Sequence, residues 1–333
     1  MFTGISLKLA LFALTMGILT WSSATWAKFK IAVIGKTKND SFYIQSFEGC
    51  KQFAAQKTDL SCLYDGPQDY QDIRSQVLII NELLTQNVNG LLVSTTDSKH
   101  LVDGVLKSML PGIPVITFDS DLLPEHEEYR LTYVGTDNFA FGVALGEYAK
   151  VFKTEAEQQI CIQSGFDSTP NLNARIAGVR HALSGQSTQR LMGHNGWSEY
   201  PRCPLYSLGK RDVALYQLTK ILEREKAPIF LAVAGFAQFN PDYISTMKKH
   251  QEAIDKQHKV IISADTEPMQ LKALGEGLST ANIGQNPHEM GRLGAELMYE
   301  YLKHGNAPEQ SHYYLGFHYC RSDNYQECTQ TGN

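Results

Sequence analysis

The stretch VIISADTEPMQLKALGEGLSTANIGQNPHEMG, residues 260–291, decides the fold class. It begins as a β-branched strand ending at Asp265, continues as an amphipathic helix, and returns to a second strand ending at Gln285 before a helix opens at Pro287. The carboxyl ends of parallel strands line the crevice where open α/β sheets bind ligands, so we expect Asp265 to be a ligand-binding carboxylate. Gln285 is expected to lie where the chain crosses between two lobes.

The same alternation of short apolar runs and helical stretches extends over most of the 333 residues. About five strands are predicted before residue 138 and about five after it. They are placed at residues 29–35, 60–64, 90–94, 113–118 and 131–134, and at 159–163, 203–207, 229–234, 260–263 and 280–285. Repeated β-α units predict an α/β protein with two doubly wound parallel-sheet lobes.

The amino-acid composition indicates a class of protein but does not identify any catalytic or binding chemistry. Hydrophobic residues make up 43% and charged residues 20%, as in an ordinary globular protein. The net charge of −5 argues against a nucleic-acid partner and against a polybasic membrane patch.

The N-terminus has the pattern of a cleaved secretory signal. Lys8 precedes an apolar run over residues 9–21, and small and polar residues follow up to Ala27. The run is shorter than the roughly 20 apolar residues that a membrane anchor needs. Residues 1–27 are therefore expected to be a signal peptide, and the protein is expected in the periplasm.

Six cysteines in an exported chain suggest disulfides, although six cysteines allow 15 connectivities. Spacing favours three local bridges, and buried free thiols are the alternative. The expected pairs are Cys50–Cys62, Cys161–Cys203 and Cys320–Cys328.

Catalytic and cofactor motifs are not visible. Gly35-Lys36-Thr37 superficially suggests a phosphate loop, but a glycine is needed five residues earlier, where Lys30 stands. This GKT is interpreted as an ordinary strand-to-helix loop. The ten histidines are scattered, without a metal-binding i, i+4 pair backed by a carboxylate. We therefore expect neither an enzyme nor a bound cofactor or metal.

Polar or aromatic residues do recur where predicted strands end. Asp119, Asp265 and Gln285 follow strands, while Phe42 and Tyr43 lie in the loop and helix start after the first strand. Any single carboxylate at a strand end could simply cap the following helix. Together these residues predict one cleft with stacking faces and hydrogen-bonding groups.

These residues lie in segments that resemble the periplasmic sugar-binding proteins of the ribose/galactose type, whose class 1 solute-binding fold is shared with LacI-type repressors. The resemblance covers residues 28–317. It is carried by KNDSFYIQSFEG (38–49), GIPVITFDSD (112–121), YVGTDNFAFG (133–142), NARIAGVR (173–180), and SADTEPMQLKALGEG with IGQNPHEMG (263–291).

The resemblance implies a role for each matched residue in the two lobes. Phe42 and Tyr43 match the aromatic pair that stacks on a sugar ring. Asp119 matches the first-lobe carboxylate that accepts from sugar hydroxyls. Arg175 matches a second-lobe arginine that can bridge adjacent oxygens.

Asp265 and Gln285 match the second-lobe carboxylate and the hinge glutamine, and Asp40 stands at the ligand-binding asparagine before the aromatic pair. Ser120 stands where the family usually has arginine, and Ala234-Gly235 where it often has Asn-Asp. These departures argue against recognition of ordinary ribose, glucose or galactose.

For the second lobe's stacking face, Trp197 and Tyr206 are the candidates.

The resemblance further implies lobes of 28–137 plus 286–317 and 138–285 plus 318–333, joined by a three-crossing hinge. Such a protein closes, as a monomer, on a sugar or related polyol and delivers it to an ABC importer. The alternative is a ligand sensor that signals through a membrane histidine kinase or chemoreceptor, as autoinducer-2-binding relatives do.

Overall fold

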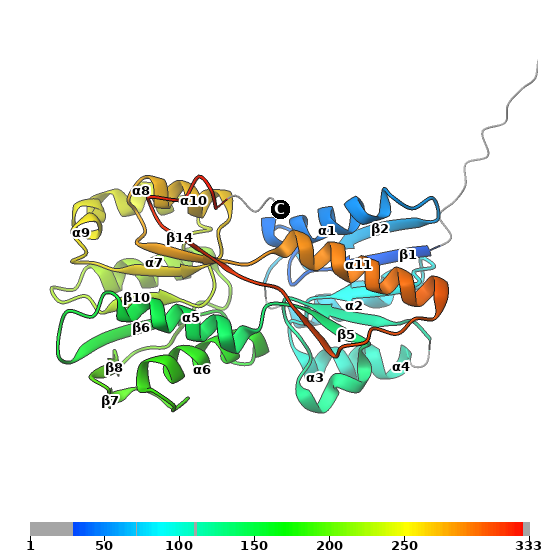
Figure 1. Cartoon of the computed structure of the whole chain (residues 1–333), viewed down its shortest axis with the longest axis horizontal. Helices are drawn as coiled ribbons and strands as arrows, with labels where there is room; N and C mark the ends of the chain where they lie inside the picture. The colour runs from blue at the N-terminus through cyan, green and yellow to red at the C-terminus, as the bar shows by residue number, and fades with distance from the viewer. Residues whose placement is uncertain (1–28, 71, 110–111, 329–333) are drawn as a thin grey trace, which may run out of the picture.

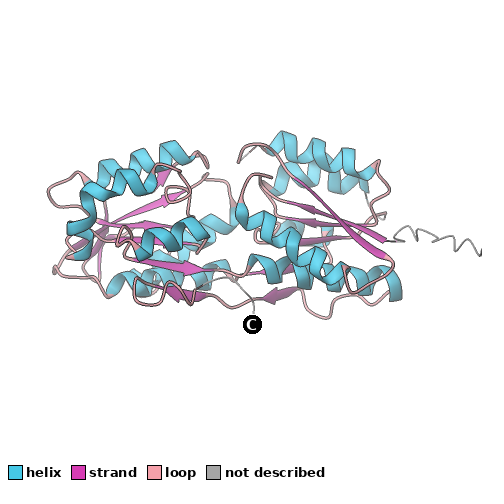
Figure 2. Ribbon diagram, turned by 90° about the horizontal axis from the view of Figure 1, so that it is seen from above, coloured by secondary structure: helices cyan, strands magenta, loops and turns pink. Residues whose placement is uncertain are grey.

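The computed structural model describes residues 29–70, 72–109 and 112–328, and it has two α/β lobes side by side (Figure 1). Each lobe is a mainly parallel sheet with helices on both faces (Figure 2), which confirms the predicted fold class. The predicted signal peptide, residues 1–27, lies outside the described residues.

The first lobe is built on a six-stranded sheet of order β13-β5-β4-β3-β1-β2, in which all pairs are parallel. Its strands are β1 (Phe29–Ile34), β2 (Leu60–Asp65), β3 (Gly90–Val93), β4 (Val115–Phe118), β5 (Thr132–Gly135) and β13 (His312–Tyr314). Its helices are α1 (Ser41–Ala54), α2 (Ile73–Leu84), α3 (Ser98–Leu101), α4 (Lys107–Met109), α11 (Pro287–His304) and a 3₁₀ helix (Pro124–Tyr129).

Alternate residues of β1 explain the helical layers of this lobe. Ile31 and Val33 belong to the core under α1 and α11, whereas Ala32 and Ile34 belong to the core under α2 and α3. Successive side chains of a strand point to opposite faces of the sheet, so an all-apolar strand needs cover on both sides.

The second lobe is built on an eight-stranded sheet of order β14-β12-β11-β10-β6-β8-β7, in which β9 also pairs with β6. The two edge strands, β14 and β7, run antiparallel to their neighbours, and the other pairs are parallel. The strands are β6 (Gln158–Ser164), β7 (Met192–His194), β8 (Trp197–Glu199), β9 (Leu205–Tyr206), β10 (Ile229–Ala232), β11 (Ile261–Ala264), β12 (Ala281–Gly284) and β14 (His318–Cys320). The helices are α5 (Asn138–Lys150), α6 (Pro170–Ser184), α7 (Arg211–Leu222), α8 (Tyr243–Met247), α9 (Gln251–Asp255), α10 (Pro268–Gly275) and a 3₁₀ helix (Lys248–His250).

Helices α5 and α6 approach closely because glycines lie at their contact. A Cβ atom at Gly142 would lie 2.1 Å from the carbonyl oxygen of Arg175, and one at Gly178 would lie 2.2 Å from that of Phe139. Any larger residue would push the helices apart. This packing fixes the position of Arg175, which the site below requires.

The chain passes between the sheets three times, between β5 and α5, between β12 and α11, and between β13 and β14. In Figure 1 the last crossing is the red segment that runs from one lobe to the other. Helix α11 thus returns to pack beside α1, although most of the second lobe separates them in the chain.

All three expected disulfides are present: Cys50–Cys62, Cys161–Cys203 and Cys320–Cys328. The first joins α1 to β2, and the second joins β6 to the segment before β9. The third closes the C-terminal loop that begins at β14.

Two features of the fold differ from the sequence-based expectation. The helical pattern that follows the strand predicted at 90–94 suggests one continuous helix, but residues Val102–Leu106 form a π-helical segment between α3 and α4. Strands β7, β8, β13 and β14 were not predicted, since each has only three residues and is defined by its partner in a sheet rather than by its own pattern.

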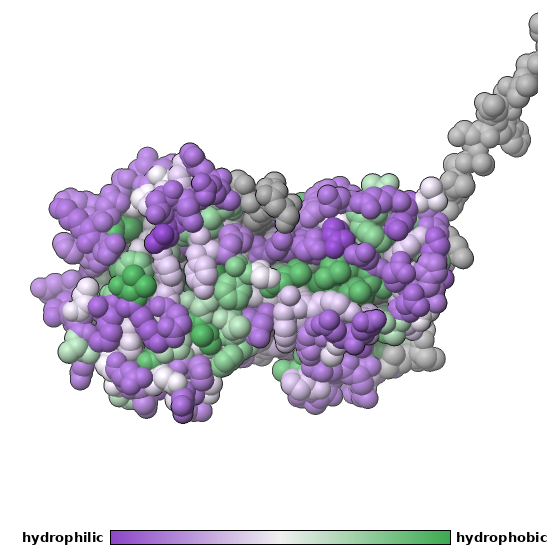
Figure 3. Space-filling model, in the orientation of Figure 1, coloured by the Kyte–Doolittle hydropathy of each residue, from purple (hydrophilic) through white to green (hydrophobic). Residues whose placement is uncertain are grey.

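On the face shown in Figure 3, hydrophilic residues cover most of the outer helices and hydrophobic ones are visible mainly in the recesses between them. Within the described part of the chain, none of the helices combines the length and the apolar character that a membrane crossing requires.

Candidate ligand site between the lobes

A small cavity of about 40 Å³ lies between the two lobes. Six of the seven predicted ligand-binding residues line it: Phe42, Tyr43, Asp119, Arg175, Asp265 and Gln285. Seven further residues complete its wall: Lys36, Tyr70, Asn171, Leu172, Ala234, Phe236 and Phe239. The structure therefore brings together residues that are up to 249 positions apart in the chain, from Lys36 to Gln285 (285 − 36).

The two aspartates occupy matching places in the two lobes. Asp119 follows β4 and Asp265 follows β11, and both have left-handed backbones, with φ of +59° and +72°. Aspartate tolerates this conformation better than most non-glycine residues, and it turns the side chain sharply out of the strand direction. Both carboxylates consequently lie at the carboxyl ends of their sheets, facing the same cavity.

On the first-lobe side, Asp119 is held by donors from three different elements. Its carboxylate accepts hydrogen bonds from the Tyr43 hydroxyl at 3.1 Å and the Ser94 hydroxyl at 2.7 Å, and a longer one from the Asn171 amide at 3.4 Å. The Lys36 ammonium is 3.6 Å away. Asn171 lies in the first turn of α6 in the second lobe, so this contact already joins the lobes.

Lys36 was interpreted as part of an ordinary loop, but the structure buries its ammonium in the cavity wall. Its side chain donates to the Asn171 Oδ1 atom at 3.0 Å. Burial lowers the pKa of Lys36 to about 8, and the nearby Asp119 carboxylate opposes that shift. Lys36 is therefore a hydrogen-bond donor whose charge is lost at moderately alkaline pH.

This shifted pKa predicts a specific pH dependence of stability. The unfolded chain, with the ordinary lysine value of 10.5, binds more protons than the native chain between pH 8 and 10.5. The free energy of unfolding should then rise with pH in that window, by up to about 1.4 kcal/mol per pH unit. We expect denaturant titrations at pH 8.0 and 9.5 to show wild type gaining about 1–2 kcal/mol relative to Lys36→Gln. The exposed Lys226→Gln is the control, and parallel pH profiles of wild type and Lys36→Gln would contradict the assignment.

On the second-lobe side, Asp265 accepts from the Gln285 amide at 2.7 Å and from the backbone N–H of Gly235 at 3.4 Å. Burial raises the pKa of Asp265 above its usual range, while Arg175 and Gln285 act in the opposite direction. A carboxylate so enclosed gains from every additional donor, such as a ligand hydroxyl.

Arg175 links these groups through three directed hydrogen bonds. Its guanidinium donates to Asn138 Oδ1 at 2.8 Å, to the Val233 carbonyl at 2.9 Å and to Gln285 Oε1 at 2.9 Å. It also lies 4.6 Å above the ring of Phe141. The side chain is nearly fully buried, so its orientation is set by the protein and is available to a ligand without rearrangement.

A continuous hydrogen-bond network crosses the hinge. Asn138, the first residue of α5, donates to the Asp119 carbonyl at 3.2 Å and accepts from Arg175. Arg175 donates to Gln285, which donates to Asp265. The two carboxylate positions are thus connected through Asn138 and Gln285, each beside a crossing of the chain.

Aromatic rings from both lobes form the apolar part of the wall. Phe42 and Tyr43, in the first turn of α1, meet edge to face at 5.3 Å. Tyr70 from the first lobe contacts Phe236 from the second, with ring centroids 5.1 Å apart and planes at 80°. Flat apolar surfaces next to charged groups suit a ligand with both C–H faces and hydroxyl groups.

The structure places Asp40 behind this wall, not along it. Its carboxylate caps α1 by accepting from the Phe42 N–H at 2.8 Å, accepts a short hydrogen bond from the Tyr70 hydroxyl, and lies 3.5 Å from Arg211. Direct contact of Asp40 with ligand therefore stays a prediction. What the structure shows is that Asp40 fixes the Tyr70 hydroxyl through a hydrogen bond.

Trp197 and Tyr206 do not line the cavity. Trp197 is buried in the second-lobe core, and Tyr206 is on the short strand β9 with 37% of its surface exposed. The second-lobe rings in the wall are Phe236 and Phe239, in the turn after β10. The two aromatic residues of GFAQF (235–239) were a signal available in the sequence, because they follow directly on Ala234-Gly235, where the chain departs from the family pattern.

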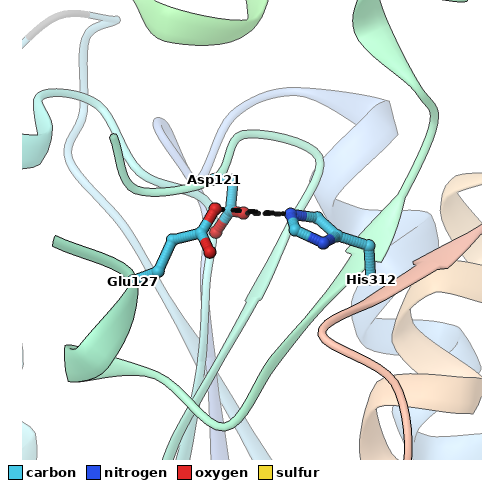
Figure 4. A group of neighbouring side chains, drawn as sticks. All are labelled: Asp121, Glu127 and His312. Atoms are coloured by element: carbon cyan, nitrogen blue, oxygen red, sulfur yellow. Dashed lines mark ion pairs between the residues drawn. The ribbon is translucent and has the colours of Figure 1, made fainter. Parts of the chain in front are cut away.

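A separate cluster of metal-binding residue types lies beside β13, where Asp121, Glu127 and His312 come within 4.8 Å of one another (Figure 4). The Arg130 guanidinium occupies their centre, with hydrogen bonds of 2.6 Å to both Asp121 oxygens and contacts of 3.3 Å to Glu127 and 3.0 Å to His312. A guanidinium is already paired with both acids, so the donor set fits a partly buried ion-pair cluster and not a cation site.

The fold and this site have counterparts among known proteins. The family model described as "Periplasmic binding protein domain" matches residues 31–307. The D-allose-binding periplasmic protein of Escherichia coli strain K12 is 24% identical over 303 residues, covering 88% of this chain and 91% of that protein. The D-ribose/D-allose-binding protein of Pseudomonas aeruginosa is 29% identical over 161 residues, 47% of this chain and half the length of that relative.

Solved structures give the same fold. An ABC transporter solute-binding protein from Agrobacterium vitis, bound with alpha-D-tagatopyranose, superposes with a TM-score of 0.77 at 19% identity, covering 90% of this chain and 97% of that one. One from Actinobacillus succinogenes with bound D-allose has a TM-score of 0.73 at 18% identity, over 90% of this chain and 100% of that one. With a family match over residues 31–307 and the two-lobed fold, the chain belongs to the periplasmic binding protein domain family.

Proposed function

We propose that this protein binds a monosaccharide or a closely related polyol between its lobes and delivers it to an ABC importer. One observation carries the proposal: a single interlobe cavity combines two buried aspartates, a buried arginine and aromatic rings from both lobes. Carboxylates accept from vicinal hydroxyls, Arg175 donates to ring or hydroxyl oxygens, and the aromatic faces cover the C–H surface of a pyranose or furanose. The named relatives that bind D-allose and D-ribose support this ligand class.

The lobe boundaries of the proposal are 28–137 plus 286–317 and 138–285 plus 318–333, with the three crossings as the hinge. Closure would be favoured by contacts that reach from one lobe to the other. Lys36 contacts Asn171 across the cavity, and the Gln45 amide donates to both Glu267 oxygens at 3.0 and 2.8 Å. A ligand that touches Asp119 and Asp265 together stabilises this closed arrangement and not the open one.

A thermal-shift screen tests the ligand class directly. The panel is D-allose, D-ribose, D-tagatose, D-arabinose, D-fucose and myo-inositol, with mass spectrometry of carbohydrate that co-purifies with the protein. We expect at least one member to raise the melting temperature, since a ligand at 100 times its Kd adds about 2.7 kcal/mol to the free energy of unfolding.

The double variant Asp119→Asn/Asp265→Asn is the matched control, because it keeps both side chains' volumes and removes both charges. It should fold and lose the shift. Absence of any shift with the panel and of any co-purified carbohydrate would refute the proposal, and so would an equal shift in the double variant.

A further inference from the structure

Tyr70 lies on a wall shared by two cavities. One is the ligand cavity of about 40 Å³, and the other is a larger chamber of about 480 Å³ that also lies between the lobes. Building on the proposed function, we infer that Tyr70 is a specificity-determining residue that limits the site to ligands of one sugar ring. Three observations support this: the anchoring of its hydroxyl, the seat of its ring, and the chemistry of the chamber behind it.

The Tyr70 hydroxyl is anchored to a fixed carboxylate. It donates a short hydrogen bond to Asp40, which is 1% exposed and is itself fixed as the N-cap of α1. Burial raises the pKa of Tyr70 well above its usual range, so the phenol remains a neutral donor. Arg211 of the second lobe reaches the same carboxylate at 3.5 Å, which ties the anchor to the closed arrangement of the lobes.

The Tyr70 side chain packs against residues of the opposite lobe. Its edge-to-face partner is Phe236, and its Cβ atom lies where Gly209 leaves room. A Cβ atom added at Gly209, whose φ is +72°, would be 2.4 Å from the Tyr70 Cβ atom. A side chain at Gly209 and the observed Tyr70 position are therefore incompatible, and the tyrosine fills this part of the second lobe's surface.

The chamber beyond Tyr70 is lined by hydrogen-bonding groups. Thr37, Asn39 and Gln68 face it from the first lobe, and Lys210, Arg211 and Asp212 face it from the second. A second sugar ring could form hydrogen bonds there. While Tyr70 separates the two cavities, however, that ring cannot be linked covalently to a ring bound at Asp119 and Asp265.

Replacing the ring should therefore extend the range of ligands. Isothermal titration with D-allose and D-ribose as monosaccharides, and with maltose and cellobiose as disaccharides, compares wild type with Tyr70→Ala, Tyr70→Leu and Tyr70→Phe. Wild type should bind a monosaccharide and neither disaccharide. Tyr70→Ala and Tyr70→Leu should bind that monosaccharide at least tenfold more weakly and gain measurable affinity for a disaccharide. Tyr70→Phe, which keeps the ring without the Asp40 hydrogen bond, should still reject disaccharides.

The outcomes separate this inference from the proposed function. If wild type binds a monosaccharide and the folded Ala or Leu variant keeps the wild-type preference, the role of Tyr70 is refuted while the proposed function stands. Wild type that binds a disaccharide as tightly as a monosaccharide also refutes it. If wild type binds none of the panel named above nor these disaccharides, the proposed function fails and this inference fails with it. Tyr70→Leu retains apolar bulk and serves if Tyr70→Ala does not fold.

Discussion

Replacement of Arg175 by alanine is expected to weaken ligand-induced stabilisation and to lower the free energy of unfolding by about 3–5 kcal/mol. The stability loss has a direct cause, since the Val233 carbonyl, Gln285 and Asn138 lose a charged donor inside the protein. A charge-assisted hydrogen bond to ligand is worth about 1.5–3 kcal/mol, so affinity should fall roughly 10- to 150-fold. Urea unfolding and titration with the sugar found in the thermal-shift screen measure the two effects.

Arg180→Ala is the matched control for this experiment. Arg180 lies on the same helix, and its guanidinium pairs with Glu199 at 2.8 Å without lining the cavity. It should lower stability and leave sugar affinity unchanged. Arg175→Lys keeps the charge, but its single nitrogen cannot replace the three guanidinium nitrogens that reach Asn138, Val233 and Gln285, so it should fold and still bind weakly. Wild-type affinity in Arg175→Lys or in a folded Arg175→Ala would exclude Arg175 from the site.

Removal of the Cys161–Cys203 disulfide is expected to cost about 4 kcal/mol of unfolding free energy. The bridge spans 42 residues, and the chain-entropy estimate for a loop of that length is about 4 kcal/mol. It also joins β6 to the segment before β9, next to the core in which Trp197 is buried. The double variant Cys161→Ala/Cys203→Ala is preferred to serine replacements. Both positions are essentially inaccessible to solvent, so serines there would bury two hydroxyl groups.

Cys320→Ala/Cys328→Ala is the comparison, because that bridge spans only 8 residues and should cost about 2.5 kcal/mol by the same estimate. Guanidinium unfolding of both double variants, followed by circular dichroism, measures the difference. An equal loss in the two variants, or a larger one for the C-terminal bridge, would contradict the loop-length argument.

Local pattern was enough to predict most of the fold. The apolar strands and amphipathic helices were recognisable because each strand of a parallel sheet is buried on both faces and must be apolar along its length. Helix starts were also locally specified, since Asp40, Asp72, Asp97, Asp137 and Asn286 cap helices with their own side chains. The short edge strands had no such pattern, because pairing with distant residues defines them.

Asp265, Gln285 and most of the other polar and stacking residues of the candidate site could be predicted from local pattern alone, because the alternation of strands and helices already specifies the strand ends and the start of α1. Five further residues of the cavity wall were found only once the chain was folded: Lys36, Tyr70, Asn171, Phe236 and Phe239. These side chains come from loops and helix starts whose neighbours belong to the other lobe. Burial of Lys36 against Asn171, and of Tyr70 against Gly209 and Phe236, exists only when the lobes meet, so local spacing carries no sign of it.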